Sequence, residues 1–353
     1  MEQLFSPLEI KSVRFRNRIA VSPMCQYSAT DGFANNWHLV HLGARAVGGA
    51  GLVLVEATGV SAQGRITPGC LGLWKDEQIG PLKNIVEFIH QQGAVAGIQL
   101  AHAGRKASCA LPWQGGRQLA LEEGGWETMA PSPIPFNDAD RPPLEMSRGD
   151  IQAFYTDYRN AVKRAREAGF KVLEIHAAHG YLLHEFMSPL SNKRLDEYGG
   201  SFDNRIRLLL ELIGEIRQEW PDELPLFVRI SATDWVEDGW TIEDSIQLAT
   251  RLQTEGIDLI DCSTGGNIGG VKIPVGAGYQ VPFAEAVRKT GMRSGAVGMI
   301  ETAQQANAII AEEKADLVLL AREFLRNPYF PLEAAKELGV ELEWPEQYLR
   351  AKK

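Results

Sequence analysis

Residues 147–181 read SRGDIQAFYTDYRNAVKRAREAGFKVLEIHAAHGY, and this stretch divides into two parts. Ser147 followed by Asp150 has the spacing of a capping box, and Gly169 is placed as a glycine that follows a helix end. A short apolar run at 172–176 comes next and predicts a buried strand. The stretch therefore predicts one helix followed by one strand.

The same unit recurs along the whole chain. Apolar runs predict strands at residues 18–22, 52–56, 94–100, 172–176, 226–230, 259–262, 296–300 and 317–321. Amphipathic segments predict helices at residues 37–47, 77–91, 151–168, 204–219, 242–254, 281–290 and 302–313. Strict alternation of strands and helices is typical of a parallel sheet with helices outside it.

Two architectures fit this alternation, a closed barrel and an open doubly wound sheet. An open dinucleotide-binding sheet would carry G-x-G-x-x-G directly after its first strand, where this chain has Pro-Met-Cys at 23–25. The nearest glycine match, Gly276-Ala-Gly278, lacks the third glycine. We therefore predict an α/β fold, a single (β/α)8 TIM barrel over residues 1–353. Residues 111–143 are predicted to be a long loop insertion after the third strand, able to cover a pocket.

Charge and cysteine content restrict the partners and the compartment. The net charge is −9, the pI is near 5.4 and no Lys/Arg-rich run occurs, which argues against nucleic acid or an anionic membrane as a partner. The four cysteines, at 25, 70, 109 and 262, form no C-x-x-C pair, so the usual pattern of an iron–sulfur or structural zinc site is missing. No segment has the pattern of a signal peptide or a membrane span. We expect a cytoplasmic protein without a disulfide framework.

Chemistry in a TIM barrel belongs at the carboxyl ends of the strands. The polar side chains expected there include Cys25, Gln99, His176, His179, Tyr181, Arg229 and Arg322. They supply a thiol, an amide, two imidazoles, a phenol and two guanidiniums, without a carboxylate pair or a Ser/His/Asp set. This group is better suited to binding a polar ring and an anion than to hydrolysis.

Several motifs together resemble the Old Yellow Enzyme family of FMN-dependent ene-reductases, in particular its bacterial class with thermophile-like members. The segments that carry the resemblance are RNRI at 16–19, PMCQY at 23–27, GLVLVEAT at 51–58, QLAHAGRKA at 99–107, GFKVLEIHAAHGYL at 169–182, FMSPLSNKR at 186–194 and DEYGGSFDNR at 196–205. Each motif alone is weak. In combination they are highly specific and cover nearly the whole chain.

The resemblance implies a reaction in two halves. NADPH or NADH reduces FMN, and the reduced flavin passes a hydride to the β-carbon of an activated alkene, an α,β-unsaturated carbonyl compound or a nitroalkene. His176 and His179 would bind the carbonyl or nitro oxygen of the substrate and stabilise the charge that develops on it. Tyr181 would protonate the α-carbon, and Tyr27 would line the substrate side.

The resemblance also assigns cofactor contacts and a subunit contact. The residues expected to bind FMN are Ser22, Pro23, Met24, Cys25, Ala57, Gln99, Arg229, Gly298, Ala321 and Arg322. The family usually has glycine at the position of Ala321, and alanine tolerates a positive φ poorly. Arg350, in the tail at about 340–353, aligns with an arginine that reaches into the active site of a neighbouring subunit, so a homodimer or homotetramer is expected.

Other readings of the residues remain open at this point. The barrel could belong to an aldolase or isomerase that acts on a phosphorylated substrate, to a non-catalytic flavin- or ligand-binding protein, or to a relative of the dienoyl-CoA reductases. His176 and His179, with His184 as a third ligand, could bind a metal. We expect no metal, because the residues around the two histidines already match another function.

Overall fold

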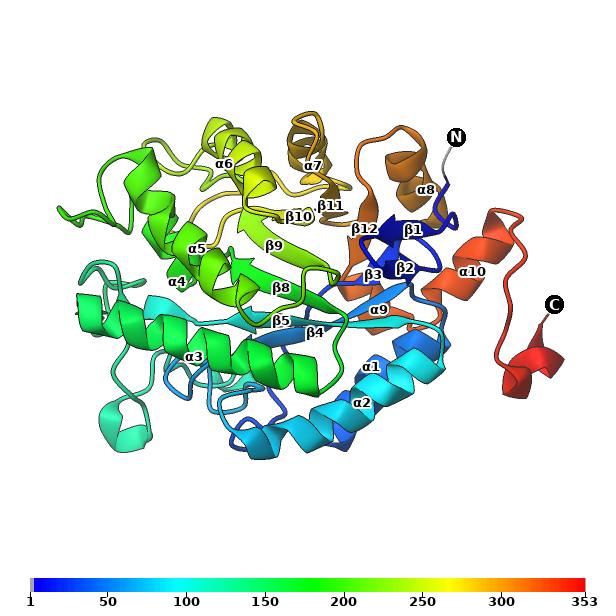
Figure 1. Cartoon of the computed structure of the whole chain (residues 1–353), viewed down its shortest axis with the longest axis horizontal. Helices are drawn as coiled ribbons and strands as arrows, with labels where there is room; N and C mark the ends of the chain where they lie inside the picture. The colour runs from blue at the N-terminus through cyan, green and yellow to red at the C-terminus, as the bar shows by residue number, and fades with distance from the viewer. Residues whose placement is uncertain (1–2, 353) are drawn as a thin grey trace.

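Eight parallel strands form a closed barrel in the computed structural model, which describes residues 3–352 (Figure 1). In sequence order the barrel strands are β3 (Ile19–Val21), β4 (Leu52–Gly59), β5 (Val95–Ala101), β8 (Val172–Ala177), β9 (Leu226–Ser231), β10 (Leu259–Ser263), β11 (Ser294–Val297) and β12 (Leu317–Leu320). Each strand pairs with the next one along the chain, and β12 pairs with β3. The predicted TIM barrel is confirmed, and the open sheet is wrong.

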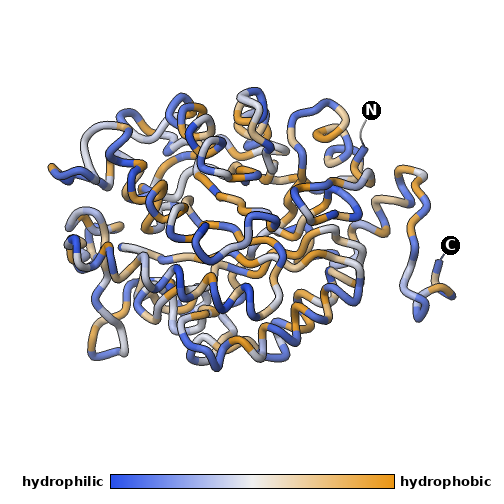
Figure 2. The backbone as a smooth tube through the Cα atoms, in the orientation of Figure 1, coloured by the Kyte–Doolittle hydropathy of each residue, from blue (hydrophilic) through white to orange (hydrophobic). Residues whose placement is uncertain are grey.

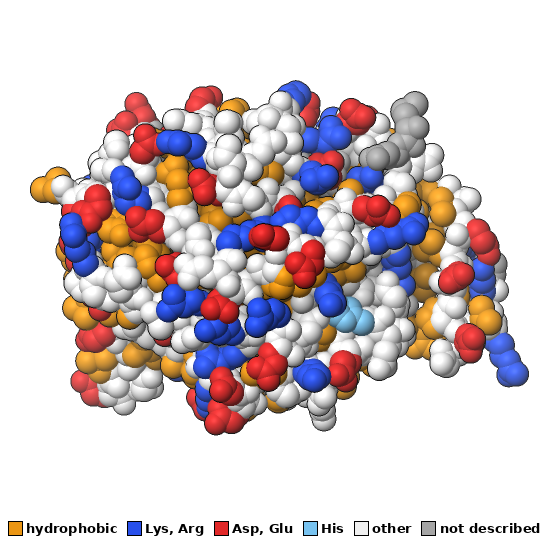
Figure 3. Space-filling model, viewed as in Figure 1, with side chains coloured by type: hydrophobic (Ala, Val, Ile, Leu, Met, Phe, Trp, Pro, Cys, Tyr) orange, Lys and Arg blue, Asp and Glu red, His pale blue; other side chains and the backbone are white. Residues whose placement is uncertain are grey.

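Helices cover the outside of this barrel. They are α1 (Asn36–Val47), α2 (Ile79–Gln91), α3 (Arg148–Glu167), α4 (Leu182–Met187), α5 (Phe202–Arg217), α6 (Ile242–Thr254), α7 (Val281–Arg288), α8 (Ala303–Ala311), α9 (Arg322–Arg326) and α10 (Phe330–Glu337). The outer helices alternate between hydrophobic and hydrophilic residues around each turn (Figure 2). Their apolar faces pack on the strands and form the larger hydrophobic cluster. The visible surface carries acidic and basic side chains intermixed (Figure 3).

The helix boundaries follow the sequence signals. Ser147 accepts a hydrogen bond from the backbone of Asp150, and the side chain of Asp150 bonds back to Ser147, so the predicted capping box is confirmed. The Thr241 cap of α6 has the same arrangement. Gly93 and Gly169 have φ angles of +74° and +92° directly after helix ends, the left-handed geometry that glycine adopts without a Cβ clash.

A hairpin that the sequence did not predict closes the amino-terminal end of the barrel. Its strands, β1 (Leu8–Ile10) and β2 (Val13–Phe15), have only three residues each. The four apolar residues that they bury, Leu8, Ile10, Val13 and Phe15, pack against strand-start residues such as Leu52, Leu259 and Leu317. This end of the barrel is therefore an apolar plug, and polar chemistry is confined to the other end.

The strand boundaries differ from the predicted ones by up to three residues, and two of these differences concern the predicted site residues Gly298 and Ala321. The seventh barrel strand was expected at 296–300, but β11 ends at Val297 because Gly298 has a φ of +118°, which no strand residue adopts. Gly298 therefore lies just beyond the strand. The eighth strand ends at Leu320, and Ala321 caps α9 with a φ of −112°. Ala321 therefore does not adopt a left-handed backbone conformation, and its Cβ causes no strain of that kind.

The predicted insertion leaves the barrel after β5 and returns at α3. It contains two short 3-10 turns, η3 (Pro112–Gln114) and η4 (Leu121–Glu123), and strand β6 (Met129–Ala130), which pairs with β7 (Leu144–Glu145). At the other end of the chain, the 3-10 turn η5 (Glu346–Ala351) stands apart from the barrel (Figure 1). Across residues 3–352, no helix combines the length and apolarity needed to cross a membrane.

Candidate active site

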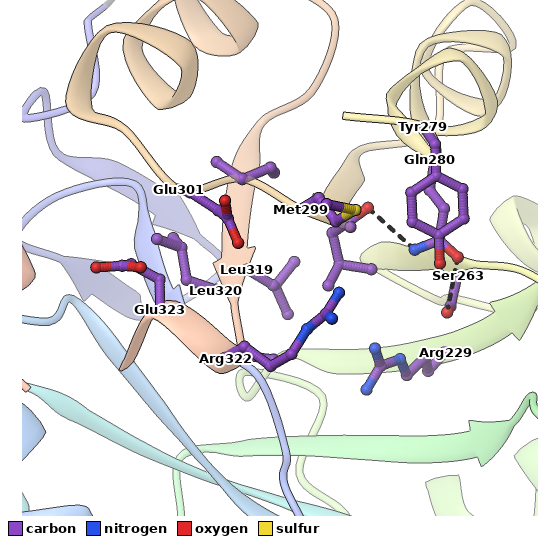
Figure 4. A pocket seen from close by; sticks show the side chains of 14 residues that line it. Arg229, Ser263, Tyr279, Gln280, Met299, Glu301, Leu319, Leu320, Arg322 and Glu323 are labelled. Carbon is purple, nitrogen blue, oxygen red and sulfur yellow. Dashed lines mark hydrogen bonds between the residues drawn. The ribbon is translucent and has the colours of Figure 1, made fainter. Parts of the chain in front are cut away.

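Residues from four barrel strands or the loops that follow them meet around one cavity at the carboxyl-terminal rim. A cavity of about 170 Å³ lies there, lined among others by Arg229, Ser263, Gly298 and Arg322. Arg229 and Arg322 reach toward the same space from separate strands, β9 and the end of β12 (Figure 4). The strand order thus brings together two guanidiniums that lie 93 positions apart in the sequence.

His176, His179 and Tyr181 form a tight aromatic group beside this cavity. The ring of His176 meets that of His179 edge-on at 5.2 Å between centroids, and that of Tyr181 at 5.0 Å. His176 is the penultimate residue of β8, so the barrel fixes its backbone, and the loop after β8 carries the other two rings. The predicted catalytic residues are therefore brought together.

Both histidines are held in the neutral form. Burial, followed by the nearby charge of Arg229, holds the pKa of His176 and the pKa of His179 well below the ordinary 6.5. The Nδ1 atom of His176 accepts a hydrogen bond from the backbone of Ala178 at 3.3 Å. Because that nitrogen is an acceptor, the hydrogen of the neutral ring lies on Nε2, which can donate to a ligand.

The ring of His179 is oriented by Ser263. Ser263 Oγ lies 2.7 Å from His179 Nε2 and 3.4 Å from Oε1 of Gln280. Gln280 Oε1 also accepts from Thr264 Oγ1 at 2.7 Å. The direction of the bond between His179 and Ser263 follows the tautomer of the ring: when Ser263 donates to Nε2, the hydrogen of His179 lies on Nδ1. In that tautomer each histidine has one ring N–H to offer a ligand.

Tyr181 remains protonated in this setting. Burial, followed by the proximity of the Cys25 thiol, raises its pKa well above 10. The ammonium of Lys106 lies over its ring, 5.1 Å from the centroid. A phenol that stays protonated at neutral pH can serve as a proton donor.

The loop that carries His179 and Tyr181 is fastened from two sides. Lys106 donates to the carbonyls of His179 and Gly266, at 2.8 and 2.9 Å. Burial lowers the pKa of Lys106 to about 8. The clamp holds His179 at a φ of +60°, which is strained for a residue other than glycine.

The second fastening is a buried contact between His184 and Asp234. His184 Nδ1 accepts from the backbone of Gly180 at 2.9 Å, and its Nε2 lies 3.1 Å from Asp234 Oδ1. Asp234 also accepts from Ser188 and from the backbone of Trp240. Both nitrogens of His184 thus have partners, which leaves none for a metal. Within residues 3–352, no three His, Cys, Asp or Glu side chains form a group that could hold a metal ion.

The residues predicted around the cofactor lie along the same rim. The backbone of Ser22 donates to Leu320, which joins the end of β3 to the end of β12. Burial, followed by the charge of Glu56, raises the pKa of Cys25 well above 9. A thiol with a raised pKa is a poor nucleophile. Gln99 donates to Oε1 of Glu174 at 2.8 Å, inside the barrel.

Tyr27 stands at a second opening, of about 200 Å³, between the loop after β3 and the insertion. Its ring meets Trp113 edge-on at 6.1 Å, and Cys109 and Phe136 line the same opening. The insertion therefore forms one wall of the entrance. Arg350, in contrast, is exposed on η5 and is not brought to the rim of its own chain.

Five residues that support the site were not selected from the sequence: Lys106, Glu174, Asp234, Asp261 and Ser263. Lys106 stood within the motif at 99–107 and carried a signal, because a lysine in the loop after a barrel strand lies at the end where the site is built. The acids carried none, because each is one polar residue in a local sequence and its partners come from other strands.

Fold and site together define a TIM-barrel enzyme with a polar pocket for an anionic ligand next to neutral imidazoles and a phenol. The chain matches the NADH:flavin oxidoreductase / NADH oxidase family over residues 3–341. It is 49% identical over 350 residues to an NADPH dehydrogenase of Geobacillus sp. (strain WCH70), and this alignment covers 98% of each chain. It is 47% identical to an NADPH dehydrogenase of Listeria innocua serovar 6a, and this alignment covers 99% of each chain.

Solved structures agree with this assignment. Morphinone reductase in complex with tetrahydroNAD is 26% identical, with a TM-score of 0.79 over 98% of this chain and 93% of that one. A 2-naphthoyl-CoA reductase is 27% identical, with a TM-score of 0.84 over 95% of this chain but only 52% of that one. The chain belongs to the NADH:flavin oxidoreductase / NADH oxidase family, the family of Old Yellow Enzyme. It is a flavoprotein and an oxidoreductase, as the resemblance of its motifs predicted.

Proposed function

We propose that the chain reduces the C=C bond of activated alkenes, α,β-unsaturated carbonyl compounds and nitroalkenes, with FMN as cofactor and NADPH, or NADH, as reductant. The observation that carries this proposal is the group of two neutral imidazoles and one protonated phenol beside Arg229. Two N–H donors and a separate proton source are what the reduction of a polarised alkene requires. When bound, FMN supplies the hydride chemistry.

The residues at the cavity fit FMN. Arg322 is exposed and makes no ion pair within residues 3–352, so its guanidinium is free to fork onto phosphate oxygens. A Cβ built on Gly298 would lie 2.8 Å from Nε2 of Gln280 and 3.0 Å from Tyr279, so only glycine keeps this cradle open. Arg322 and the backbone of Gly298 and Ala321 would hold the phosphate. Arg229 would face the ring, with Gln99, Ala57 and residues 22–25 around it.

The protein's own part in the reaction is polarisation and proton delivery. Nε2–H of His176 and Nδ1–H of His179 would both donate to the substrate oxygen and stabilise the negative charge that develops on it. Because both rings are neutral, they act as hydrogen-bond donors and not as acids. Tyr181 would then give its phenolic proton to the α-carbon. Tyr27 would line the entrance on the substrate side.

The test of this proposal is a comparison of the wild type with Tyr181→Phe. The hydroxyl makes no hydrogen bond within the described residues, so the variant keeps the ring contacts with His176 and Lys106. We expect it to retain FMN, phenol binding and reduction by NADPH, and to reduce cyclohexenone ~10²–10⁴-fold more slowly. With a nitroalkene the variant should release unprotonated nitronate. Full-speed reduction of cyclohexenone would remove Tyr181 from the proton-donor role, and heat-released FAD in place of FMN would overturn the cofactor assignment.

The neighbouring subunit is a separate part of the proposal. Arg350 lies on the exposed turn η5, which stands off the barrel with exposed Tyr348 and Leu349 beside it. We propose that this tail reaches a second copy, in a homodimer or homotetramer, and adds Arg350 to the substrate side of the partner's site. Arg350→Ala should then weaken phenol binding only under conditions where the oligomer is assembled. A monomer in light scattering at all concentrations would refute this.

A further inference from the structure

Two carboxylates are sealed inside the barrel, one layer below the histidines and beside the guanidinium of Arg229, which lines the rim cavity. Glu174 precedes His176 by two residues on β8 and so faces the same side of the strand. Glu174 and Asp261 are both 0% exposed. Asp261 on β10 pairs in register with Arg229 on β9, and its Oδ2 lies 3.0 Å from Arg229 Nε. None of the catalytic roles proposed above uses either acid.

The charges in this layer do not balance if both acids are ionised. Two carboxylates would then share one guanidinium without contact with water. Glu174 Oε2 and Asp261 Oδ1 have no hydrogen-bond partner within the described residues, and Asp261 Oδ2 has only the ion pair with Arg229 Nε. An uncompensated buried charge costs several kcal/mol, so one acid must hold a proton. Asp261 is the acid paired with the guanidinium, which leaves Glu174, whose Oε1 accepts only from the neutral amide of Gln99.

Among residues 3–352, Arg229 is the only group facing Glu174 that supplies a positive charge. His176, on the same strand, is neutral. Tyr158 of α3, on the outer side, is neutral and donates to the carbonyl of Leu100. Burial, followed by the charge of Asp261, raises the pKa of Glu174 to about 8, although Arg229 acts in the opposite direction. The charge count and the direction of this pKa shift both indicate that Glu174 holds the proton.

We propose that Glu174 is held as a neutral carboxylic acid inside the barrel and acts as a positioning residue for the charge of Arg229. While Glu174 keeps its proton, Asp261 alone balances Arg229, and the guanidinium can offer its charge to the cofactor ring. When Glu174 loses the proton to solvent, the layer gains one negative charge beneath that ring. The proposal rests on the proposed function only in placing a flavin next to Arg229.

The proton itself can be observed without turnover. The holoenzyme at about pH 7 should show the infrared carbonyl band of protonated carboxylic acids. Glu174→Gln should remove the component of this band that comes from Glu174. Glu185→Gln is the matched control, because Glu185 is a second buried acid whose pKa burial raises to about 8. Glu185→Gln should remove a different component of the band and leave the Glu174 component in place. Asp261→Asn should also remove the Glu174 component, because Glu174 then ionises as the only partner of Arg229. A band unchanged by Glu174→Gln would overturn the proposal.

Stability against pH gives a second readout on the same variants. The pKa of Glu174 in the folded protein is about 8, against an ordinary 4.5. The folded state therefore holds the extra proton, and its stabilising effect is lost as pH rises from about 4.5 to about 8. Relative to Glu174→Gln, the unfolding constant of the wild type should rise about tenfold per pH unit in that window and level off above it. A constant ratio would contradict a raised pKa.

The link to Arg229 is tested by the midpoint potential of the bound flavin. Wild type and Glu174→Gln should have similar potentials at about pH 7, where both side chains are neutral. Above about pH 8 the wild type should fall below the variant, because its new negative charge disfavours the electron-rich cofactor. Equal potentials at all pH values would refute the link. Failure of the chain to bind FMN would refute the proposed function. The infrared carbonyl band and the pH dependence of stability would still show whether Glu174 is protonated.

Discussion

Gly180 is the position where the site is most sensitive to a single added carbon. It lies between His179 and Tyr181 with a φ of +70°. A Cβ there would lie 2.2 Å from the carbonyl oxygen of Gly266 and 2.6 Å from Cα of Asn267. Both are backbone atoms that cannot rotate away, and the Gly266–Asn267 loop is itself held by Lys106 and Arg105. Gly180→Ala must therefore push the two loops apart.

The magnitude follows from two contributions. A left-handed alanine costs about 1–2 kcal/mol, and overpacking against fixed neighbours adds about 1–3 kcal/mol. Gly200 is the matched control, because its φ is +81° and no atom of residues 3–352 lies within 4 Å of its added Cβ. Gly200→Ala bears only the first contribution. For 353 residues, an unfolding entropy of about 2.1 cal/mol/K per residue converts these figures into Tm losses of about 3–7 °C for Gly180→Ala and about 1–3 °C for Gly200→Ala.

Thermal unfolding and steady-state reduction of cyclohexenone measure the two consequences separately. Gly180→Ala should keep its flavin but lose turnover, because its displaced loop carries both an oxygen-binding histidine and the proton donor. Gly200→Ala should lose a little stability and no turnover. If the two variants had the same Tm and the same activity, the close contact between the His179 and Gly266 loops would not exist in solution.

The remaining predictions concern the anion site and the imidazoles. Arg322→Ala should raise the FMN dissociation constant while the fold survives, as circular dichroism and flavin titration can check; an unchanged constant would place the phosphate elsewhere. His176→Ala and His179→Ala should each weaken transition-state binding of an enone by ~2.7–4 kcal/mol in the oxidative half-reaction and slow flavin reduction by NADPH less. Because the pKa values of both histidines lie well below 6.5, phenol affinity from about pH 6 to about pH 8 should show no imidazole titration; a tenfold change there would mean a charged ring.

The sequence predicts the barrel well because its signals are local. Each strand–helix unit carries its own apolar run, cap and stop, and eight units in strict alternation leave little choice of fold. The hairpin β1–β2 is different, because strands of three residues hold too few positions to show a pattern. The end of β11 also depended on one backbone angle, that of Gly298, which residue type alone does not fix.

The residues of the site can likewise be divided into those that a local motif predicts and those whose contacts depend on other strands. His176, His179 and Tyr181 lie within six residues, so one motif could bring them together. The supports of that motif, Lys106 and Asp234, come from other strands, and their contacts follow from barrel closure. Closure also decides which acid faces which guanidinium inside the barrel.

The charge of Arg229 connects the two halves of the proposed reaction. After burial, this charge is the largest cause of the lowered pKa of both histidines, and we propose that the proton on Glu174 keeps the charge from being cancelled. When Glu174 ionises above about pH 8, Arg229 is more fully neutralised and the pKa of each histidine rises. The histidines nevertheless stay neutral, because their burial still holds the pKa of each ring below the ordinary 6.5. High pH should therefore alter the cofactor side of the site and leave the oxygen-binding side unchanged, so the two half-reactions of one enzyme should have different pH profiles.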